Sequence, residues 1–436
     1  MKIDTTESRV LREMNELSWS ESLSAYSQQI ATIVETEDWD TPECSVCLPS
    51  ASSLYQESIA VVDKLVTAPL QYVFLLGIGG SNLGTDAIHA ALRNRFSRHT
   101  HPELISLDTV SAADITALSE RIPTDLSPES YVVFLISKSG TTTETITNAE
   151  LLYRHVLPDP QARTNRTIVI TDIDSALDRY ANEQGMLRLH IPEKVGGRFS
   201  VFSPVGIAPL HALGHPVVEL LRGAQDAVVD HTKADVANNP AALVATKVVA
   251  AIEQGYTVYD LFVFDPALEV VGKWHRQLVG ESIGKRENKK GEVVETGIVP
   301  TVSVGSTDLH SVGQLYLGGL PTVLTMFVSI EQSGTDFTIM QGHTDSTLST
   351  LVPDIAGRST HDIQQAIFAG TKDAYNEAGR PFAIAELASG SAYEIGMLMQ
   401  YKMIEVMYIA HLLDINAFDQ PNVERYKIFT KEYLRT

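Results

Sequence analysis

The sequence predicts an α/β protein with two doubly wound domains, each a parallel sheet sandwiched between helices. Short apolar runs rich in β-branched and aromatic side chains alternate with segments of helical periodicity along most of the chain, which is typical of buried parallel sheets. The 436 residues are also too many for one ordinary hydrophobic core. Helical segments are expected before the first domain and after the second.

The first predicted sheet uses four strands in the first half of the chain. Tyr131–Ile136 is an uninterrupted apolar run, as expected for a strand covered on both faces. Each strand is followed by a helical pattern, and repeated strand–helix units predict a mostly parallel sheet. The expected strands are 71–76, 103–107, 131–136 and 167–170, and the helices begin near 82, 112, 143 and 175.

The second predicted sheet follows a helical stretch over residues 203–253. Its expected strands are 257–263, 298–303, 321–329 and 381–387, with helices at 267–280, 307–317, 359–378 and 391–413. A last helix is expected from Pro421, because proline fits the first helical turn. Residues 286–297 are predicted to form a polar surface loop. The expected units are an N-terminal helical extension at 1–50, a first domain at 51–215 and a second domain at 216–436.

Composition restricts the kinds of partner. The 44% hydrophobic and 20% charged residues are typical of a globular protein. The net charge of −21 argues against a nucleic-acid partner, because a phosphate backbone needs a basic surface. The N-terminal residues lack the apolar core of a secretory signal, and no apolar run is long enough to span a bilayer. We therefore expect a soluble cytoplasmic protein without a membrane partner.

The two cysteines form a C-x-x-C sequence. Cys44 and Cys47 could be a redox pair or half of a zinc site. The nearest histidine in the sequence is His89, and Pro42 and Pro49 bracket the pair in a predicted loop rather than at a strand–helix junction. We interpret the pair as incidental loop thiols and expect no metal site.

The segment Ser137–Thr142 is the strongest candidate for a ligand site. It follows the predicted strand Tyr131–Ile136 and precedes a helix that begins near Thr143, and five of its six side chains offer hydroxyl or ammonium donors. A helix N-terminus supplies unpaired N–H groups and a favourable dipole for an anion. The sequence therefore predicts a phosphate site, with a solvated polar turn as the alternative.

A glycine-rich turn, Gly77–Gly84, follows the first predicted strand. It matches neither the dinucleotide fingerprint, because Asn82 stands where the third glycine should be, nor a P-loop, because Thr85 follows Gly84. Glycines at the carboxyl end of a parallel strand let the backbone approach a ligand closely. A tight turn without a ligand is the alternative.

Two charged residues lie in positions that suit catalysis. Arg198 is flanked by glycines in Gly196–Ser200, where a permanently charged guanidinium could reach a developing oxyanion. Glu281 ends an apolar helical pattern, where a carboxylate is unfavourable for the helix dipole. An ordinary ion-paired arginine and a solvated glutamate are the alternatives.

Three further polar residues are weaker candidates. His310 follows the strand 298–303, and a histidine beside the carboxyl end of a parallel strand is an acid–base candidate. Gln420 and Lys427 are seven residues apart and share one face of the last predicted helix. A structural histidine and a solvated lysine are the alternatives.

Taken together, these stretches resemble the phosphoglucose isomerase family, which is built from two sugar-isomerase domains. The length of the chain is similar to that of the compact bacterial forms. Six motifs match in order across residues 77–427: Gly77–Gly84, Ser137–Thr142, Gly196–Ser200, Gly280–Lys285, Thr307–His310, and Phe418–Gln420 with Val423, Glu424 and Lys427.

The resemblance implies interconversion of glucose 6-phosphate and fructose 6-phosphate without a cofactor or metal. Glu281 would move a proton between C1 and C2, a task for a sheltered carboxylate, and Arg198 would stabilise the enediol intermediate. His310 and Lys427 would assist ring opening, and Gln420 would contact the substrate. The family's histidine comes from the neighbouring subunit, which implies a homodimer with His310 shared across the interface.

The resemblance also assigns the binding residues. The phosphate would be held by Ser137, Lys138, Ser139 and Thr142, and the sugar would be lined by Gly80 and Ser81. Lys138 would supply local positive charge against the negative field of the whole protein.

Two departures and two competing functions accompany the resemblance. Asn422 stands where the family favours glycine or alanine, a change we expect to be tolerated because asparagine adopts left-handed backbone comparatively easily. The connection between Glu281 and His310 looks longer than in short relatives, because of residues 286–297.

A sugar-phosphate-sensing regulator would be expected to carry a DNA-binding or partner module, and an amino-sugar isomerase would be expected to carry a nitrogen-handling domain. Neither module is visible in the sequence.

Overall fold

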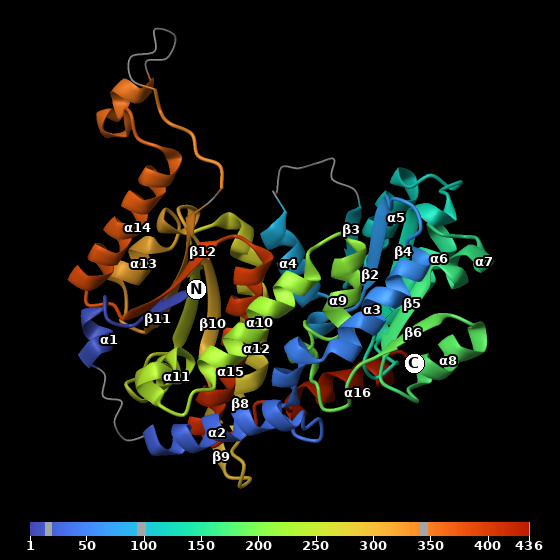
Figure 1. Cartoon of the computed structure of the whole chain (residues 1–436), viewed down its shortest axis with the longest axis horizontal. Helices are drawn as coiled ribbons and strands as arrows, with labels where there is room; N and C mark the ends of the chain where they lie inside the picture. Colours follow the sequence, from blue (N-terminus) through green and yellow to red (C-terminus); the bar gives the residue numbers. More distant parts are fainter. Residues whose placement is uncertain (14–19, 94–101, 333, 341–347, 436) are drawn as a thin grey trace.

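The computed structural model describes residues 1–13, 20–93, 102–332, 334–340 and 348–435. Figure 1 shows two sheets side by side, with helices between and around them. Residues 14–19 of the predicted N-terminal helical extension lie outside the described residues.

The first sheet is entirely parallel. Its strand order is β3-β2-β4-β5-β6, so the first strand in sequence lies inside the sheet and the chain winds outward in both directions. Every residue of β4 is buried, as its apolar sequence predicts. The strands are β2 (Tyr72–Leu76), β3 (Glu103–Leu107), β4 (Tyr131–Ile136), β5 (Thr167–Thr171) and β6 (Leu187–His190).

The second sheet has the order β1-β12-β11-β7-β10 and is parallel except for β1, which pairs antiparallel with β12. Neither β1 nor β6 was among the predicted strands. Both are short, and their sequences KID and LRLH contain no apolar run. The strands are β1 (Lys2–Asp4), β7 (Val258–Val263), β10 (Val299–Val304), β11 (Val323–Gln332) and β12 (Phe382–Ser389).

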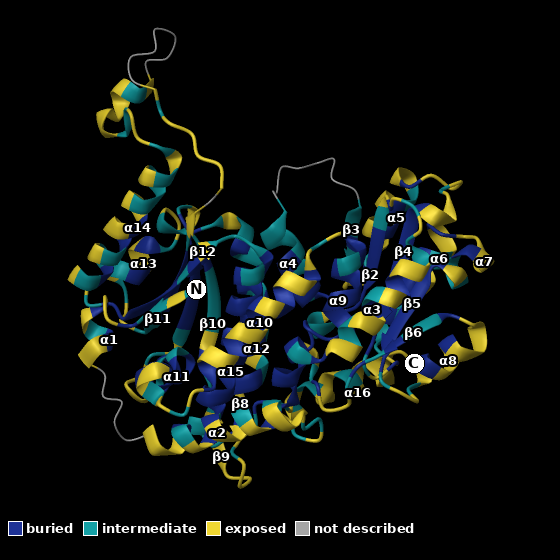
Figure 2. Cartoon of the chain, in the orientation of Figure 1, coloured by how far each residue is buried: buried dark blue, intermediate teal, exposed yellow. Residues whose placement is uncertain are grey.

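Helices cover both sheets and fill the space between them. Figure 2 shows buried residues concentrated in the strands and in the helices that pack on them. Helix α15 has most of its length buried and packs against α10, α11 and α12. The α-helices are α1 (Arg9–Glu13), α2 (Ser20–Thr36), α3 (Ser52–Leu65), α4 (Leu83–Leu92), α5 (Ala112–Arg121), α6 (Thr143–His155), α7 (Pro160–Asn165), α8 (Ala176–Gln184), α9 (Pro204–Ala212), α10 (Val217–His231), α11 (Pro240–Glu253), α12 (Glu269–Ile283), α13 (Gly313–Gly318), α14 (Thr360–Glu377), α15 (Ala392–Leu412) and α16 (Glu424–Tyr433).

This architecture confirms the predicted fold class of two parallel α/β sheets. Helix α6 begins at Thr143, where the sequence predicts it, and most other elements lie within a few residues of their expected positions. The last helix is divided into a 3₁₀ turn, Pro421–Val423, and α16. The domain limits at residues 50 and 215 stay predictions.

The prediction that residues 286–297 form a loop without regular secondary structure is wrong. It folds as a hairpin of β8 (Lys285–Glu287) and β9 (Val293–Thr296). Its turn closes because the side chain of Asn288 accepts hydrogen bonds from the backbone of Lys290 and Glu292, and Gly291 has a φ of 79°. Most of its residues are exposed, so no apolar alternation marked the strands.

The cysteines also lie in regular structure rather than in the predicted loop. Cys44 and Cys47 belong to the 3₁₀ helix η1 (Cys44–Ser50), and both are buried and free. Burial raises the pKa of Cys44 to about 12 and that of Cys47 to about 11. Such thiols stay protonated and are poor nucleophiles, which supports their interpretation as incidental.

The described residues form neither a metal-binding cluster nor a membrane-spanning helix. Among residues 1–13, 20–93, 102–332, 334–340 and 348–435, no group of three or more His, Cys, Asp or Glu side chains could hold a metal ion. Within the same ranges, no helix is both long and apolar enough to cross a membrane.

Candidate active site

A cavity of about 630 Å³ lies at the carboxyl ends of β2, β4 and β5, facing α12 and the C-terminal segment. This is the edge at which open parallel sheets bind ligands. The cavity is lined by Ile78, Gly79, Gly80, Ser81, Lys138, Ser139, Thr141, Thr142, Thr143, Glu144, Asp172, Gly197, Arg198, Gln277, Glu281, Gln420, Val423, Glu424, Tyr426, Lys427, Ile428, Thr430 and Lys431.

The predicted phosphate loop forms one wall. Ser137 lies behind the lining residues, and its hydroxyl is 2.8 Å from that of Thr142. Gly140 has a φ of 70°, and a Cβ there would lie 2.7 Å from the backbone nitrogen of Leu177. Thr142 is the N-cap of α6 but makes no side-chain capping bond, and it lines the cavity together with Thr143 and Glu144 of the first turn. A helix N-terminus without a side-chain cap offers unpaired N–H groups, which favour an anionic ligand.

Lys138 has a structural connection that the sequence did not indicate. Its ammonium donates to the backbone carbonyls of Glu193 at 2.6 Å and Val195 at 2.8 Å. These residues lead directly into the turn that carries Arg198. One of the three ammonium donors is left for a ligand, so Lys138 ties the phosphate loop to the arginine turn while lining the cavity.

The two glycine-rich turns contact each other. A Cβ on Gly80 would lie 2.1 Å from the carbonyl carbon of Gly197, so the two backbones can meet only without a side chain there. Gly79 has a φ of 62°. The glycines thus bring the turns η2 (Gly79–Ser81) and η4 (Gly197–Phe199) together at the cavity wall.

Arg198 is buried at the centre of the site, with a side chain only 3% exposed. Its Nε donates to the hydroxyl of Ser282 at 2.7 Å. Its Nη1 donates to Glu281 Oε2 and to Gln420 Oε1, each at 3.2 Å, and its Nη2 donates to the carbonyls of Ala417 and Asp419. Burial lowers the pKa of Arg198, and the Glu281 carboxylate opposes that shift. The guanidinium keeps its charge and holds both Glu281 and Gln420 by hydrogen bonds from Nη1.

Glu281 lies in the last turn of α12, with a side chain 29% exposed. One carboxylate oxygen accepts from Arg198, and Oε1 accepts from Gln277 Nε2 at 3.0 Å. Gln277 was not among the site residues predicted from the sequence. Its position four residues before Glu281 places both on one helix face, which was the available signal.

The C-terminal segment forms the remaining wall. Gln420 precedes the 3₁₀ turn rather than lying in the last helix. Lys427 lines the cavity, but its ammonium pairs with Glu424 Oε1 at 2.7 Å. No residue of α16 is buried. Asn422 is exposed and is not in the left-handed region, so its tolerance does not require the backbone argument made from the sequence.

His310 is the predicted site residue that the structure does not bring to this cavity. It is exposed and follows the 3₁₀ turn η7 (Thr307–Leu309), just before α13. The other predicted residues either line the cavity or, like Ser137, support a residue that does.

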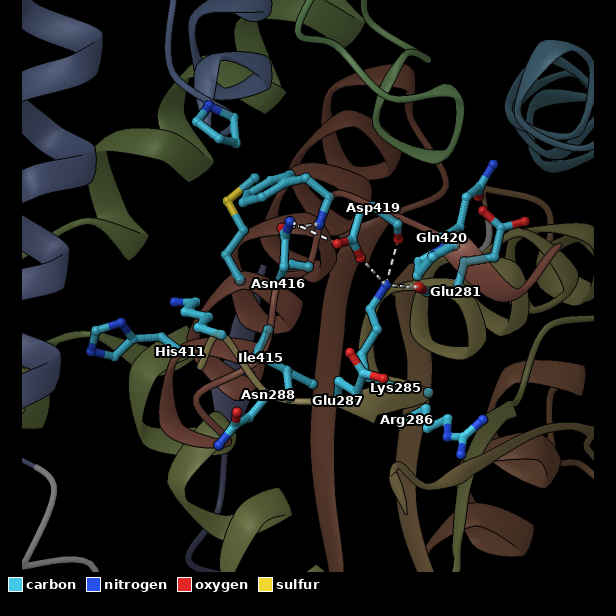
Figure 3. A pocket seen from close by; sticks show the side chains of 18 of the residues that line it. Glu281, Lys285, Arg286, Glu287, Asn288, His411, Ile415, Asn416, Asp419 and Gln420 are labelled. Carbon is cyan, nitrogen blue, oxygen red and sulfur yellow. Dashed lines mark hydrogen bonds and ion pairs between the residues drawn. The ribbon is translucent and has the colours of Figure 1, made fainter. Parts of the chain in front are cut away.

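A second cavity of about 600 Å³ adjoins the first and shares Glu281, Gln420 and Val423 with it. Figure 3 shows Lys285 in this cavity, with dashed lines that mark its hydrogen bonds to Asp419 and to Glu281. Its walls also include His411 of α15 and residues of the β8–β9 hairpin.

The chain is similar to known proteins over most of its length. The sequence model described as phosphoglucose isomerase matches residues 63–435. A glucose-6-phosphate isomerase from Carboxydothermus hydrogenoformans is 32% identical over 393 residues, covering 87% of this chain and 83% of the relative. One from Symbiobacterium thermophilum is 32% identical over 360 residues, covering 81% and 78%.

Solved structures show the same fold. A hypothetical protein from Thermus thermophilus superimposes with a TM-score of 0.83 at 26% identity, over 100% of both chains. A glucose-6-phosphate isomerase from Chlamydia trachomatis gives a TM-score of 0.77 at 19% identity, covering 95% of this chain and 85% of the other.

Proposed function

Because the chain belongs to the phosphoglucose isomerase family, we propose that the cavity between the phosphate loop and α12 is its active site. The protein catalyses the reversible interconversion of glucose 6-phosphate and fructose 6-phosphate, a step of glycolysis and gluconeogenesis. The observation that carries the assignment of the site is the contact of Arg198 with both Glu281 and Gln420, in a cavity whose opposite wall is the phosphate loop. The two competing functions, a sugar-phosphate-sensing regulator and an amino-sugar isomerase, are no longer candidates, because the chain belongs to the phosphoglucose isomerase family.

The phosphate group of the substrate is the part that anchors it in the cavity. We assign its binding to Lys138, Ser139, Thr142 and the first N–H groups of α6, with Ser137 orienting Thr142. Gly80 and Ser81 would line the sugar, since both face the same cavity. Fixing the phosphate at one end of the cavity holds carbons C1 and C2 of the sugar beside the opposite wall, which carries Glu281.

Glu281 is the proposed base. Isomerisation requires removal of a proton from the carbon next to a carbonyl and its return to the neighbouring carbon. The carboxylate has two fixed donors, Arg198 and Gln277, so its orientation is set before the substrate arrives. Arg198 would also stabilise the negative charge that develops on the enediol oxygen, because its charge is permanent and already desolvated.

Ring opening requires a proton to leave one oxygen and another to reach the ring oxygen. We assign this step to Lys427 and to His310 of a second copy, with Gln420 contacting the sugar. Lys427 lines the cavity of its own chain, whereas His310 is exposed and does not. An exposed histidine beside α13 is available to the cavity of a neighbouring subunit.

Exposed apolar side chains support the proposed homodimer. Leu315 and Leu320, close to His310 in the chain, are 59% and 78% exposed. Phe337, Leu348 and Leu351 are 69–76% exposed and belong to residues 334–340 and 348–359, which project from the body in Figure 1. Apolar surface of this kind is typical of an interface. The cytoplasmic location expected from the sequence stays a prediction.

The phosphate assignment predicts a binding defect. Lys138→Met should raise KM for fructose 6-phosphate about tenfold and change kcat less, because a phosphate contact is made in both ground and transition states. Steady-state kinetics at constant ionic strength provides the measurement. Lys194→Met, which removes an exposed lysine beside the Glu193 carbonyl, is the matched control and should leave both constants unchanged. A loss confined to kcat would rule out the phosphate role.

The shared histidine predicts complementation between two inactive variants. In a mixed dimer of His310→Ala and Glu281→Gln chains, one site combines both lesions and the other has neither. Random reassociation of equal amounts should therefore restore about a quarter of wild-type activity in a twofold-symmetric dimer. Unmixed variants treated in the same way are the control. If His310 acts in its own chain, mixing will restore nothing.

A further inference from the structure

We infer that Lys285 is a positioning residue for the isomerisation, which holds the segment Ala417–Gln420 against the end of α12. In this way it keeps Gln420 and Arg198 in place beside Glu281. The inference rests on the proposed roles of Glu281 and Arg198. It gives a function to a buried cation that has no place in the proton-transfer steps.

The contacts of the ammonium use all of its donors. Lys285 Nζ donates to the backbone carbonyl of Glu281 at 2.9 Å, to Asp419 Oδ1 at 3.0 Å and to the carbonyl of Asp419. Figure 3 shows the side chain reaching toward these groups from the strand below. An ammonium has three donors, so none is left for a substrate. Lys285 is also absent from the lining of the substrate cavity.

Burial shows that this is a built arrangement rather than a surface ion pair. The side chain of Lys285 is only 6% exposed, whereas that of Asp419 is 49% exposed. Burial lowers the pKa of Lys285, and the Asp419 carboxylate opposes that shift. A desolvated ammonium is tolerated only where acceptors replace its water, so its three acceptors fix where the head group can lie.

Lys285 and Arg198 hold the same short segment. The carbonyl of Asp419 accepts from Lys285 Nζ and also from Arg198 Nη2, at 3.1 Å in the second case. Arg198 lines the substrate cavity and Lys285 lines the second cavity. The next residue, Gln420, lines both and accepts from Arg198. Without Lys285, the Asp419 carboxylate would keep, among the described residues, its bond from Asn416 alone, and one of the two cations holding the segment would be lost.

Lys285 also fixes the backbone of the proposed base. Helix α12 ends at Ile283, so the carbonyl of Glu281 is among the last-turn carbonyls that lack an intrahelical partner. The ammonium supplies that partner and places a positive charge at the negative end of the helix dipole. A single side chain therefore links the Glu281 backbone to the segment that carries Gln420.

The test separates positioning from simple stabilisation. Lys285→Met keeps the length of the side chain and removes its donors. Misplacing catalytic groups by about 1 Å costs up to about a hundredfold, so we expect kcat to fall ten- to a hundredfold while KM stays within about twofold. Lys285→Arg should recover most of the lost kcat, because a guanidinium can also donate to several acceptors. Lys289→Met, which removes an exposed lysine of the same hairpin, should behave as wild type. A Lys285→Met protein with wild-type kcat and a lowered melting temperature would overturn the inference.

A second variant covers the case in which Lys285→Met does not fold. Asp419→Asn changes a half-exposed side chain and keeps the backbone carbonyl contact, so a smaller loss of kcat, about three- to tenfold, is expected with KM unchanged. Wild-type kcat in folded Asp419→Asn would count against the inference.

Binding measurements distinguish this inference from the proposed function. Calorimetry with fructose 6-phosphate on Glu281→Gln and on Glu281→Gln/Lys285→Met should give dissociation constants within about twofold, because Lys285 touches no substrate and the proposed phosphate loop, which supplies most of the binding, is unchanged. A tenfold weaker complex in the double variant would contradict a positioning role. Full turnover by Glu281→Gln alone would instead remove the proposed base, whatever Lys285 does.

Discussion

Replacing Glu281 with glutamine should lower kcat about 10³- to 10⁴-fold, because the amide cannot accept the proton that the reaction moves between C1 and C2. Binding of fructose 6-phosphate should persist, since the amide oxygen can still accept from Arg198 and the phosphate loop is untouched. A coupled assay measures the first effect and calorimetry the second.

The matched control is Glu287→Gln in the β8–β9 hairpin. Glu287 is exposed and does not line the substrate cavity, so its replacement should leave kcat unchanged. If Glu281→Gln kept a tenth or more of wild-type activity, another group would have to be the base.

Arg198→Lys should lower kcat about 10²- to 10³-fold, the loss expected when a preorganised donor to a developing oxyanion is removed. The guanidinium bonds Ser282, Glu281, Gln420 and two backbone carbonyls at once, and an ammonium with three donors cannot reproduce that arrangement. The melting temperature should fall as well, because buried acceptors lose their partners. Kinetics and thermal unfolding of the same preparation give both values.

Arg188→Lys provides the comparison for the arginine variant. Arg188 of β6 pairs with Asp178 of α8 and is outside the substrate cavity. Its replacement should leave kcat unchanged. Wild-type kcat in Arg198→Lys, with only the melting temperature lowered, would show that Arg198 is structural.

The parts of the fold that could be predicted from sequence are those in which local pattern and tertiary environment agree. The strand β4 is apolar because both of its faces are covered, and Thr143 begins α6 directly after a polar loop. The strands β1 and β6 depend instead on pairing with β12 and β5, which three or four residues of sequence do not reveal. The β8–β9 hairpin was missed for a related reason, since its exposed strands have no apolar side facing a core.

The residues of the candidate site also differ in how far the sequence indicates their roles. Arg198 and Glu281 both lie in motifs. The structure places Arg198 Nη1 3.2 Å from Glu281 Oε2, although the two residues are 83 positions apart in the chain. Gln277 lies outside the six motifs. Lys285 ends the motif Gly280–Lys285, but its role appears only where the end of α12 meets the C-terminal segment. For His310, the sequence contains no information about which copy of the chain it would serve.

The most direct test of the account is the exchange of hydrogen at C2. With wild-type protein in D₂O and a chelator present, fructose 6-phosphate should give glucose 6-phosphate that carries deuterium at C2, because the Glu281 carboxyl is 29% exposed and can exchange its proton with solvent. Glu281→Gln should bind the same substrate and incorporate no deuterium. Incorporation at the wild-type rate in that variant would contradict the account.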